Sequence, residues 1–279
     1  MTRFFWLASY PKSGNTWMRL ALSSLRSGGG AVDINRFRVA DETIAADRGA
    51  FDLALDVESS DLSEAEILAA RPAAFRAMAA ELRTTAIWKV HEAYLEAAPG
   101  QPLFPPDITL GAVYMVRDPR DVVVSLSHHA GICIDQAIAD MASSAHRLSG
   151  QRRRAQPQLP QPVLDWSGHV ESWLDRPAFP VIPVRYEDML TGLSGILTRI
   201  AAAIGLTVTA AAIEGAVAAT RFDTLRHQEA ERGFVEKSPK AAVFFRRGGA
   251  GGWRDILTEA QAERICTDHG RVMTRLGYL

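Results

Sequence analysis

The stretch YPKSGNTW, from Tyr10 to Trp17, lies between an apolar run, Phe4 to Ala8, and a helical pattern that continues through Leu25. We expect a buried parallel strand, a tight loop and a helix in that order. Such a loop cradles a phosphate, because backbone N–H groups, the positive end of the helix dipole and an ammonium group converge on one anion. The stretch therefore predicts an anion site.

The order of residues in this loop differs from that of the loop that binds nucleoside triphosphates. The latter has a second glycine before its lysine and a Ser or Thr that holds Mg²⁺. Here Lys12 precedes Gly14, the only glycine of the loop. We therefore expect an anion held without a metal ion, which argues against ATP as the ligand.

The composition of the 279-residue chain is that of a globular protein with a sizeable core, since 47% of its residues are apolar. A formal net charge of −1 gives no general attraction to nucleic acid or to an anionic membrane. The two cysteines, Cys133 and Cys266, cannot form a disulfide framework, and we expect reduced thiols in a cytoplasmic protein. Neither a signal peptide nor a run of about 20 apolar residues for a membrane span is expected. The many alanines and arginines favour a bacterial source.

Four short apolar runs are predicted to be strands: Phe4–Tyr10, Ala86–Val90, Leu110–Val116 and Val181–Tyr186. Helical patterns separate them, at residues 16–25, 64–82, 118–128, 189–204 and 257–276. Alternating strands and helices predict an α/β fold with a central parallel β-sheet flanked by helices. We find no convincing linker, and expect a single domain over residues 1–279.

Local signals mark several helix ends. Ser63 and Glu66 form a capping-box pattern before the helix at 64–82, which Pro72 is expected to break or kink. Asp118, followed by a proline, is expected to cap the next helix, and Asp188 the one after that. Residues 151–162 are predicted to be an exposed loop or lid, and residues 226–252 an irregular segment.

Polar residues follow three of the predicted strands. Lys12 follows the first, Lys89 and His91 end the second, and Arg117 ends the third. Ligands of parallel sheets bind beyond the carboxyl ends of the strands. These residues are therefore candidates for a binding site.

Several separated motifs together resemble the soluble sulfotransferases that use 3′-phosphoadenosine 5′-phosphosulfate (PAPS). The main motifs are YPKSGNTW at 10–17, VRDPRDVVVS at 116–125 and RRGGAGGWR at 246–254, with shorter matches at 89–91, 185–189 and 220–223. They occur in the family's order and span nearly the whole chain. The resemblance implies a P-loop-like, nucleotide-kinase-like sulfotransferase fold, with PAPS as co-substrate and no metal.

The resemblance also implies catalytic roles. Lys12 would bind the bridging oxygen of the phosphosulfate and stabilise charge on the leaving phosphate. His91 would be the general base that accepts the proton of the acceptor hydroxyl, a task that suits an ordinary pKa of about 6.5. Lys89 would lie near the sulfonyl oxygens or help to position the donor.

A further set of residues would bind the donor. The phosphosulfate loop would supply Lys12, Ser13, Gly14, Asn15, Thr16 and Trp17. The 3′-phosphate would be held by Arg117, Ser125, Arg246, Arg247 and Gly248. Trp17 and Phe222 would sandwich the adenine, with Tyr186 and Thr220 nearby. Arg120 and Asp121 are interpreted as a surface ion pair.

Alternatives stay open at this point. A kinase with a variant loop would need Mg²⁺, and a nucleotide-binding scaffold would have lost turnover. The acceptor would be a phenol, a glycan, or a hydroxyl on a lipid or other small molecule, and would contact the variable segments at about 32–56 and 131–166. The family's dimer motif is matched only in part, at Arg254, Thr258, Glu259 and Glu263, so a monomer and a homodimer both remain possible. The pair His128-His129 lacks further ligands at metal spacing, and Arg152 to Arg154 form too short a basic run to predict nucleic acid binding.

Overall fold

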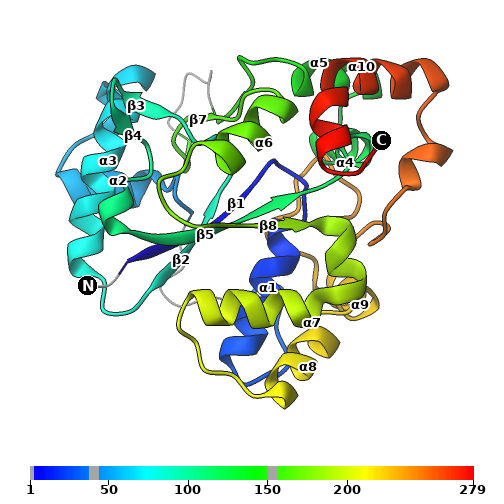
Figure 1. The fold of residues 1–279 in the computed structure, drawn as a ribbon, viewed down its shortest axis with the longest axis horizontal. Coiled ribbons are helices and arrows are strands. Elements are labelled where there is room, and N and C mark those ends of the chain that lie inside the picture. Colours follow the sequence, from blue (N-terminus) through cyan, green and yellow to red (C-terminus); the bar gives the residue numbers. More distant parts are fainter. Residues whose placement is uncertain (1–2, 38–43, 150–155) are drawn as a thin grey trace. The chain divides into compact units, whose positions relative to one another are not determined.

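The structure, a computed structural model, describes residues 3–37, 44–149 and 156–279. Its central element is a parallel four-stranded sheet with the strand order β2-β1-β5-β8 (Figure 1). The strands are β1 (Phe4–Ser9), β2 (Ala86–Val90), β5 (Thr109–Val116) and β8 (Val181–Arg185). Each end lies within one residue of the predicted one, and the predicted parallel sheet flanked by helices is confirmed.

Strands β1 and β2 show how the sheet places residues at its edge. Every residue of β1 is buried, which explains the apolar run from Phe4 to Ala8. The two strands run parallel with Trp6 opposite Trp88 and Ala8 opposite Val90. Continuing this register by one residue brings Ser9 level with His91.

The helices are α1 (Asn15–Arg26), α2 (Arg48–Leu55), α3 (Glu64–Glu81), α4 (Pro119–Ala130), α5 (Ile134–Met141), α6 (Trp166–Asp175), α7 (Tyr186–Ala203), α8 (Ala210–Ala219), α9 (Phe222–Arg232) and α10 (Glu259–Arg275). Two-stranded sheets join β3 (Glu96–Ala98) to β4 (Gln101–Pro102) and β6 (Arg147–Leu148) to β7 (Gln161–Pro162). Short 3₁₀ helices are η1 (Ser59–Asp61), η2 (Pro106–Ile108) and η3 (Gly252–Asp255).

Three expectations about helices need correction. Helix α3 has the predicted capping box but continues through Pro72, because residues such as Ile67 and Phe75 are buried on both sides of the proline and hold the helix in place. Helix α7 begins at Tyr186 with Arg185 as its N-cap, so Asp188 lies in the first turn, where a carboxylate favours the helix dipole. The segment predicted to be irregular from residue 226 is helical up to Arg232 in α9. Of the predicted lid at 151–162, residues 151–155 lie outside the described residues.

The described chain divides into two compact units. The first contains the described residues of Met1–Tyr10, Ala40–Tyr114 and Ser144–Ile182. Its core is rich in aromatic rings that contact one another, among them Trp6, Phe75 and Phe104. The indole N–H of the fully buried Trp6 donates to Thr109 Oγ1 at 3.1 Å, which satisfies its polar atom.

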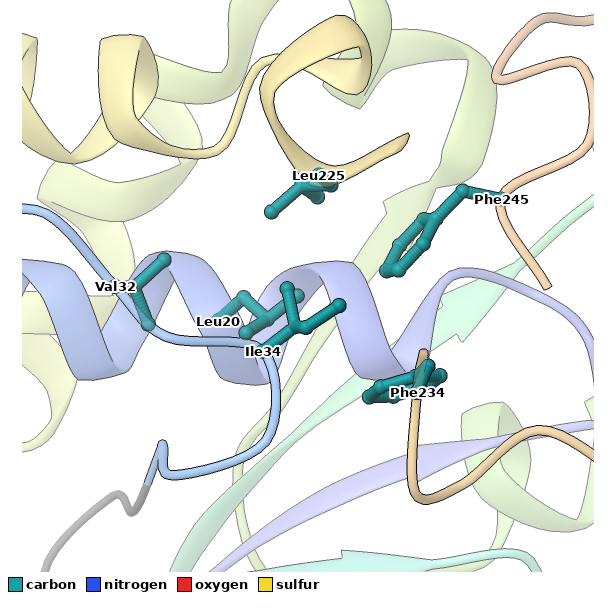
Figure 2. Close-up of a cluster of buried hydrophobic side chains, with 6 residues drawn as sticks. All are labelled: Leu20, Val32, Ile34, Leu225, Phe234 and Phe245. Carbon is teal, nitrogen blue, oxygen red and sulfur yellow. The ribbon is translucent and has the colours of Figure 1, made fainter. Parts of the chain in front are cut away.

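The second unit contains the described residues of Pro11–Val39, Met115–Ser143 and Pro183–Leu279. One of its cores is shown in Figure 2 and consists of Leu20, Val32, Ile34, Leu225, Phe234 and Phe245. It joins α1, the segment after α1, α9 and the segment after α9. Trp17 and Phe222 pack against it, so this core fixes two of the predicted donor-binding residues. A single domain over residues 1–279 stays a prediction.

In the part of the chain that the structure describes, no helix alone is both long and apolar enough to span a membrane. The bent pair α4 and α5 meets the length and composition criteria only when its two helices are taken together.

Candidate active site

The loop from β1 to α1 has the geometry of an anion-binding turn. Gly14 is the N-cap of α1 with φ 98°, and as a glycine it has no side chain to occupy the first N–H groups of the helix. Ser13 is fully buried, and its Oγ has no hydrogen-bond partner in the described part of the chain. A buried hydroxyl in this state costs about 1–3 kcal/mol. An oxygen of a phosphate would satisfy the hydroxyl and the helix N–H groups, so this loop fits the predicted ligand.

Two residues of the loop have left-handed backbone. At Gly14 a Cβ atom would lie 2.8 Å from the Tyr186 ring, so the position needs glycine on steric grounds as well. Lys12 has φ 70°, which costs a residue with a side chain about 1–2 kcal/mol. Lys12 Nζ lies 4.3 Å from the centroid of the Phe244 ring, a cation–π contact. Local strain at the predicted catalytic lysine is typical of a functional site.

Arg117 connects three segments that carry predicted donor-binding residues. Its guanidinium donates to Gly249 O at 2.9 Å and to Lys12 O at 3.4 Å. The same group lies 4.2 Å from the centroid of the Tyr186 ring. Its Nε is buried and has no partner among the described residues. A phosphate oxygen would be a suitable acceptor for this N–H.

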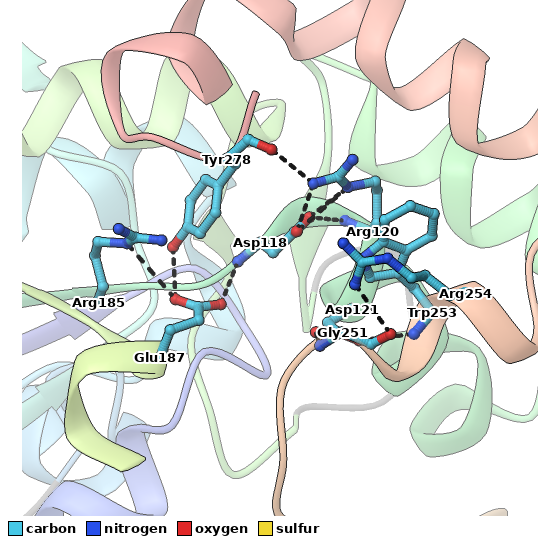
Figure 3. Close-up of polar contacts among 9 residues, drawn as sticks. All are labelled: Asp118, Arg120, Asp121, Arg185, Glu187, Gly251, Trp253, Arg254 and Tyr278. Carbon is cyan, nitrogen blue, oxygen red and sulfur yellow. Dashed lines mark hydrogen bonds and ion pairs between the residues drawn. The ribbon is translucent and has the colours of Figure 1, made fainter. Parts of the chain in front are cut away.

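Asp121 holds the glycine-rich segment that follows Arg247, and its role was not predicted (Figure 3). It is 4% exposed, and its two carboxylate oxygens accept the N–H groups of Gly251 at 2.6 Å and Trp253 at 3.0 Å. The predicted surface ion pair with Arg120 is therefore wrong. Adjacent residues of a helix point in different directions, and Arg120 is also buried, where it pairs with Asp118 at 2.8 Å.

Glu187 holds the backbone of Asp118 in place (Figure 3). Its carboxylate accepts the N–H of Asp118 at 3.0 Å and the hydroxyl of Tyr278 at 2.9 Å. Burial raises the pKa of Glu187 above its ordinary value. Arg117 precedes Asp118 in sequence, and Tyr186 precedes Glu187. The hydrogen bond between Asp118 and Glu187 therefore also holds Arg117 and Tyr186 next to each other.

The predicted adenine-binding residues lie together in the second unit. Trp17 Nε1 donates to Thr220 O at 3.0 Å, and the Trp17 and Tyr186 rings are 5.8 Å apart in an edge-to-face arrangement. The Thr220 hydroxyl is buried and donates to Ala216 O, so its carbonyl is the part that meets Trp17. A Cβ at Gly248 would lie 2.0 Å from the Phe222 ring, which shows how closely that ring packs on the main chain.

The remaining candidates for the 3′-phosphate site differ in their surroundings. Burial lowers the pKa of Arg246, and the nearby charges of Arg247 and Arg117 lower it further, which marks a positively charged region suited to an anion. Arg247 is exposed and donates to Gly252 O and to Asp255, at 2.9 and 3.0 Å. Ser125 lies on α4, partly exposed, one turn after Asp121.

His91 lies in the first unit, directly after β2. Its Nδ1 lies 2.9 Å from Ser9 O and 3.3 Å from Ser9 Oγ. A carbonyl oxygen can only accept, so Nδ1 carries a proton, and in the neutral ring the lone pair is on Nε2. Lys89 is half-buried in β2, and its carbonyl accepts the N–H of Ala45 at 2.9 Å. The neutral form of His91 thus has the tautomer that a general base needs, with its lone pair on Nε2.

Within residues 3–37, 44–149 and 156–279 no group of three or more His, Cys, Asp and Glu side chains could hold a metal ion.

Residues 100–277 match the model of the sulfotransferase domain family, and this chain belongs to that family. Human sulfotransferase 2B1 is 25% identical over 165 residues, which cover 54% of this chain and 41% of that protein. Cytosolic sulfotransferase 16 of Arabidopsis thaliana is 28% identical over 165 residues, covering 55% of this chain and 47% of that protein. The chain thus matches less than half the length of either relative.

Solved structures share the fold. Retinol dehydratase in complex with androsterone and the inactive cofactor PAP (3′-phosphoadenosine 5′-phosphate) superposes with a TM-score of 0.62 and 20% identity, over 98% of this chain and 82% of that one. Mouse sulfotransferase SULT7A1 with PAP superposes with a TM-score of 0.60 and 17% identity, over 99% of this chain and 88% of that one. The predicted sulfotransferase fold is confirmed.

Proposed function

We propose that this chain is a PAPS-dependent sulfotransferase that moves the sulfonyl group of PAPS to a hydroxyl of a small-molecule, glycan or lipid acceptor. One observation carries the proposal. Two buried donors in the second unit, Ser13 Oγ and Arg117 Nε, have no partner in the described part of the chain. Arg117 also contacts the main chain of Lys12, the residue before Ser13. An anion with phosphate oxygens would satisfy both donors.

The second unit would bind the donor and stabilise the leaving group. The N–H groups at the start of α1, Ser13 and Lys12 would face the 5′-phosphosulfate, with Asn15 and Thr16 in the same turn. Lys12 would stabilise the charge that develops on the phosphate oxygen as its bond to sulfur breaks. The 3′-phosphate would be held by Arg117, Ser125, Arg246, Arg247 and Gly248, and the adenine by Trp17, Phe222, Tyr186 and Thr220.

His91 would act as the general base, with Lys89 nearby as a positioning or sulfonyl-binding group. The hydroxyl oxygen of the acceptor forms a bond to sulfur while the bond from sulfur to the phosphate oxygen breaks. The proton of the hydroxyl passes to His91 Nε2, and the electron pair of the broken bond leaves with the phosphate. The contact of Nδ1 with Ser9 O supports this assignment, because it leaves the lone pair on Nε2.

The test is transfer of ³⁵S from labelled PAPS to an alcohol, with His91→Ala as the first variant. We expect turnover to fall by about 10²–10⁴-fold, since that is the usual contribution of general-base catalysis, while PAP affinity stays within about threefold. His227→Ala is the matched control, because His227 is 73% exposed on α9 and pairs with Glu231. Unchanged turnover in His91→Ala would reject His91 as the base.

Two solved structures of a relative hold androsterone or retinol together with PAP. Alcohols of this kind are therefore the first acceptors to test. A cytoplasmic location, a bacterial source and the oligomeric state stay predictions.

A further inference from the structure

His169 is a buried histidine that the proposed reaction does not use. It lies on α6, is fully buried, and its Nε2 is 3.1 Å from the main-chain oxygen of His91, 78 residues away in sequence. Because that oxygen is a carbonyl, Nε2 must be the donor. Burial lowers the pKa of His169 to about 3, so the ring is neutral near pH 7 and Nδ1 is an acceptor.

Tyr114 completes this arrangement. Its hydroxyl lies 2.8 Å from His169 Nδ1, and as the ring nitrogen accepts, the hydroxyl donates. Tyr114 is itself fully buried in β5. The direction of every hydrogen bond from Tyr114 through His169 to His91 is therefore fixed by chemistry. The chain of bonds ends on the residue that is proposed to take the proton.

The two neighbouring peptides are also held by buried groups. The N–H of His91 donates to Glu92 Oε2 at 3.2 Å. Glu92 is 0% exposed and forms a buried ion pair with Arg71, which also donates to Ala45 O at 2.9 Å. The main-chain oxygen of Glu92 accepts the indole N–H of Trp173 at 2.9 Å. The backbone at His91 and Glu92 is thus fixed on both sides by buried side chains.

This support is needed because β2 ends at Val90, so the ladder of the sheet does not extend to His91. The contact of Nδ1 with Ser9 O holds one atom of the ring, but rotation of the peptide after the strand end would still shift the imidazole. Displacing a catalytic group by about 1 Å can reduce a rate by about 10²-fold. A buried polar group also has to be paired, so the network has a single low-energy arrangement.

We propose that His169, held by Tyr114, is a positioning residue of the transfer reaction, which fixes the carbonyl of His91 and thereby the direction of its ring. This inference rests on the proposed function, because it assumes that His91 is the base. It predicts that His169 affects the chemical step and leaves the binding of the donor nearly unchanged.

The test compares His169→Leu with His169→Gln. Leucine fills the space without an N–H, whereas the glutamine amide can donate to His91 O and accept from Tyr114. We expect kcat to fall by about 10–100-fold in His169→Leu and to recover to within about fivefold of wild type in His169→Gln. The PAP affinity of both variants should stay within about threefold of wild type. Tyr114→Phe removes only the outer hydroxyl and should lower kcat by about three- to tenfold.

A matched control is His269→Leu, which removes another buried histidine, on α10. It should lower the melting temperature without changing kcat of the folded protein.

If His169→Leu does not fold, Tyr114→Phe carries the test through its expected three- to tenfold loss of kcat, and a wild-type kcat in Tyr114→Phe would then overturn the inference. Wild-type kcat in His169→Leu, or a His169→Gln no more active than His169→Leu at equal melting temperature, would overturn the inference. The variant His91→Ala distinguishes failure of this inference from failure of the proposed function. If His91→Ala is inactive, either of these results rejects only the role of His169, whereas full activity in His91→Ala would reject the proposed role of His91 as the base.

Discussion

Replacing Asp121 by asparagine should weaken binding of PAP, although the change removes a negative charge from the proposed 3′-phosphate site. Asp121 contacts the main chain of Gly251 and Trp253 and lies among positive groups that include Arg246. On Coulomb's law alone, loss of its charge would strengthen binding of a phosphate. We expect the opposite, because Asp121 holds the segment next to Arg246 and Arg247, the arginines that we propose bind the 3′-phosphate.

The size of the effect follows from the two hydrogen bonds of Asp121. A hydrogen bond to a charged group contributes about 1.5–3 kcal/mol. Asparagine keeps one acceptor oxygen and turns an NH₂ group toward the second main-chain N–H, so at least one bond is lost. If about 2 kcal/mol of this loss appears in binding, the Kd of PAP rises about 30-fold.

The assay is calorimetric titration with PAP and with 5′-AMP, which lacks the 3′-phosphate. The affinity for 5′-AMP should change by no more than about threefold. Asp268→Asn is the matched control, since it makes the same change of charge on α10, where Asp268 pairs with Arg264. Tighter binding of PAP by Asp121→Asn, or an equal loss for both nucleotides, would refute the reasoning.

Two further predictions concern single side chains. Gly248→Ala should weaken the binding of PAP by at least about tenfold, because the new Cβ would lie 2.0 Å from the Phe222 ring. The control is Gly205→Ala, where φ is similar but a Cβ would have nothing within 4 Å, so this change should only cost about 1 kcal/mol of stability. Equal PAP affinities in the two variants would contradict the proposed contact. His169 has a folded-state pKa of about 3, below its unfolded value of about 6.5, so the unfolded chain binds the proton first and stability is lost as the pH falls through this window. At pH 5 the protonation of this group lowers the free energy of unfolding by about 2 kcal/mol. In urea unfolding, the fall in this free energy from pH 7 to pH 5 should therefore be about 2 kcal/mol smaller in His169→Gln than in wild type. The same fall in both proteins would show that His169 titrates normally.

Strands β1, β2 and β5 could be predicted because nearly all of their residues are buried, which requires apolar runs in the sequence. Ala86–Val90 was predicted with its observed ends, and the start of β1 at Phe4 was also correct. Helix α6 was missed; it begins at Trp166, where the segment treated as variable ends. Its buried residues Trp166, His169, Val170 and Trp173 nevertheless recur at helical spacing, so the signal was present.

The supporting residues of the site were harder to predict. Asp121 was paired with Arg120 because the two are adjacent, yet neighbours on a helix do not face each other, and this rule alone could have separated them. For His169 the sequence holds no such clue. Its contact with His91 joins residues 78 apart, and only the packing of α6 brings them together. Motifs can predict the residues at strand ends, whereas the buried groups that orient them depend on tertiary contacts.

The most direct test of the central claim is the preference of the chain for a nucleotide with phosphates at both the 3′ and 5′ positions. In one calorimetric series with PAP, 5′-AMP and ATP with Mg²⁺, the positive groups around Arg117 and the loop at Ser13 should bind PAP at least about 100-fold more tightly than either of the others. Equal or tighter binding of 5′-AMP or ATP would contradict the account.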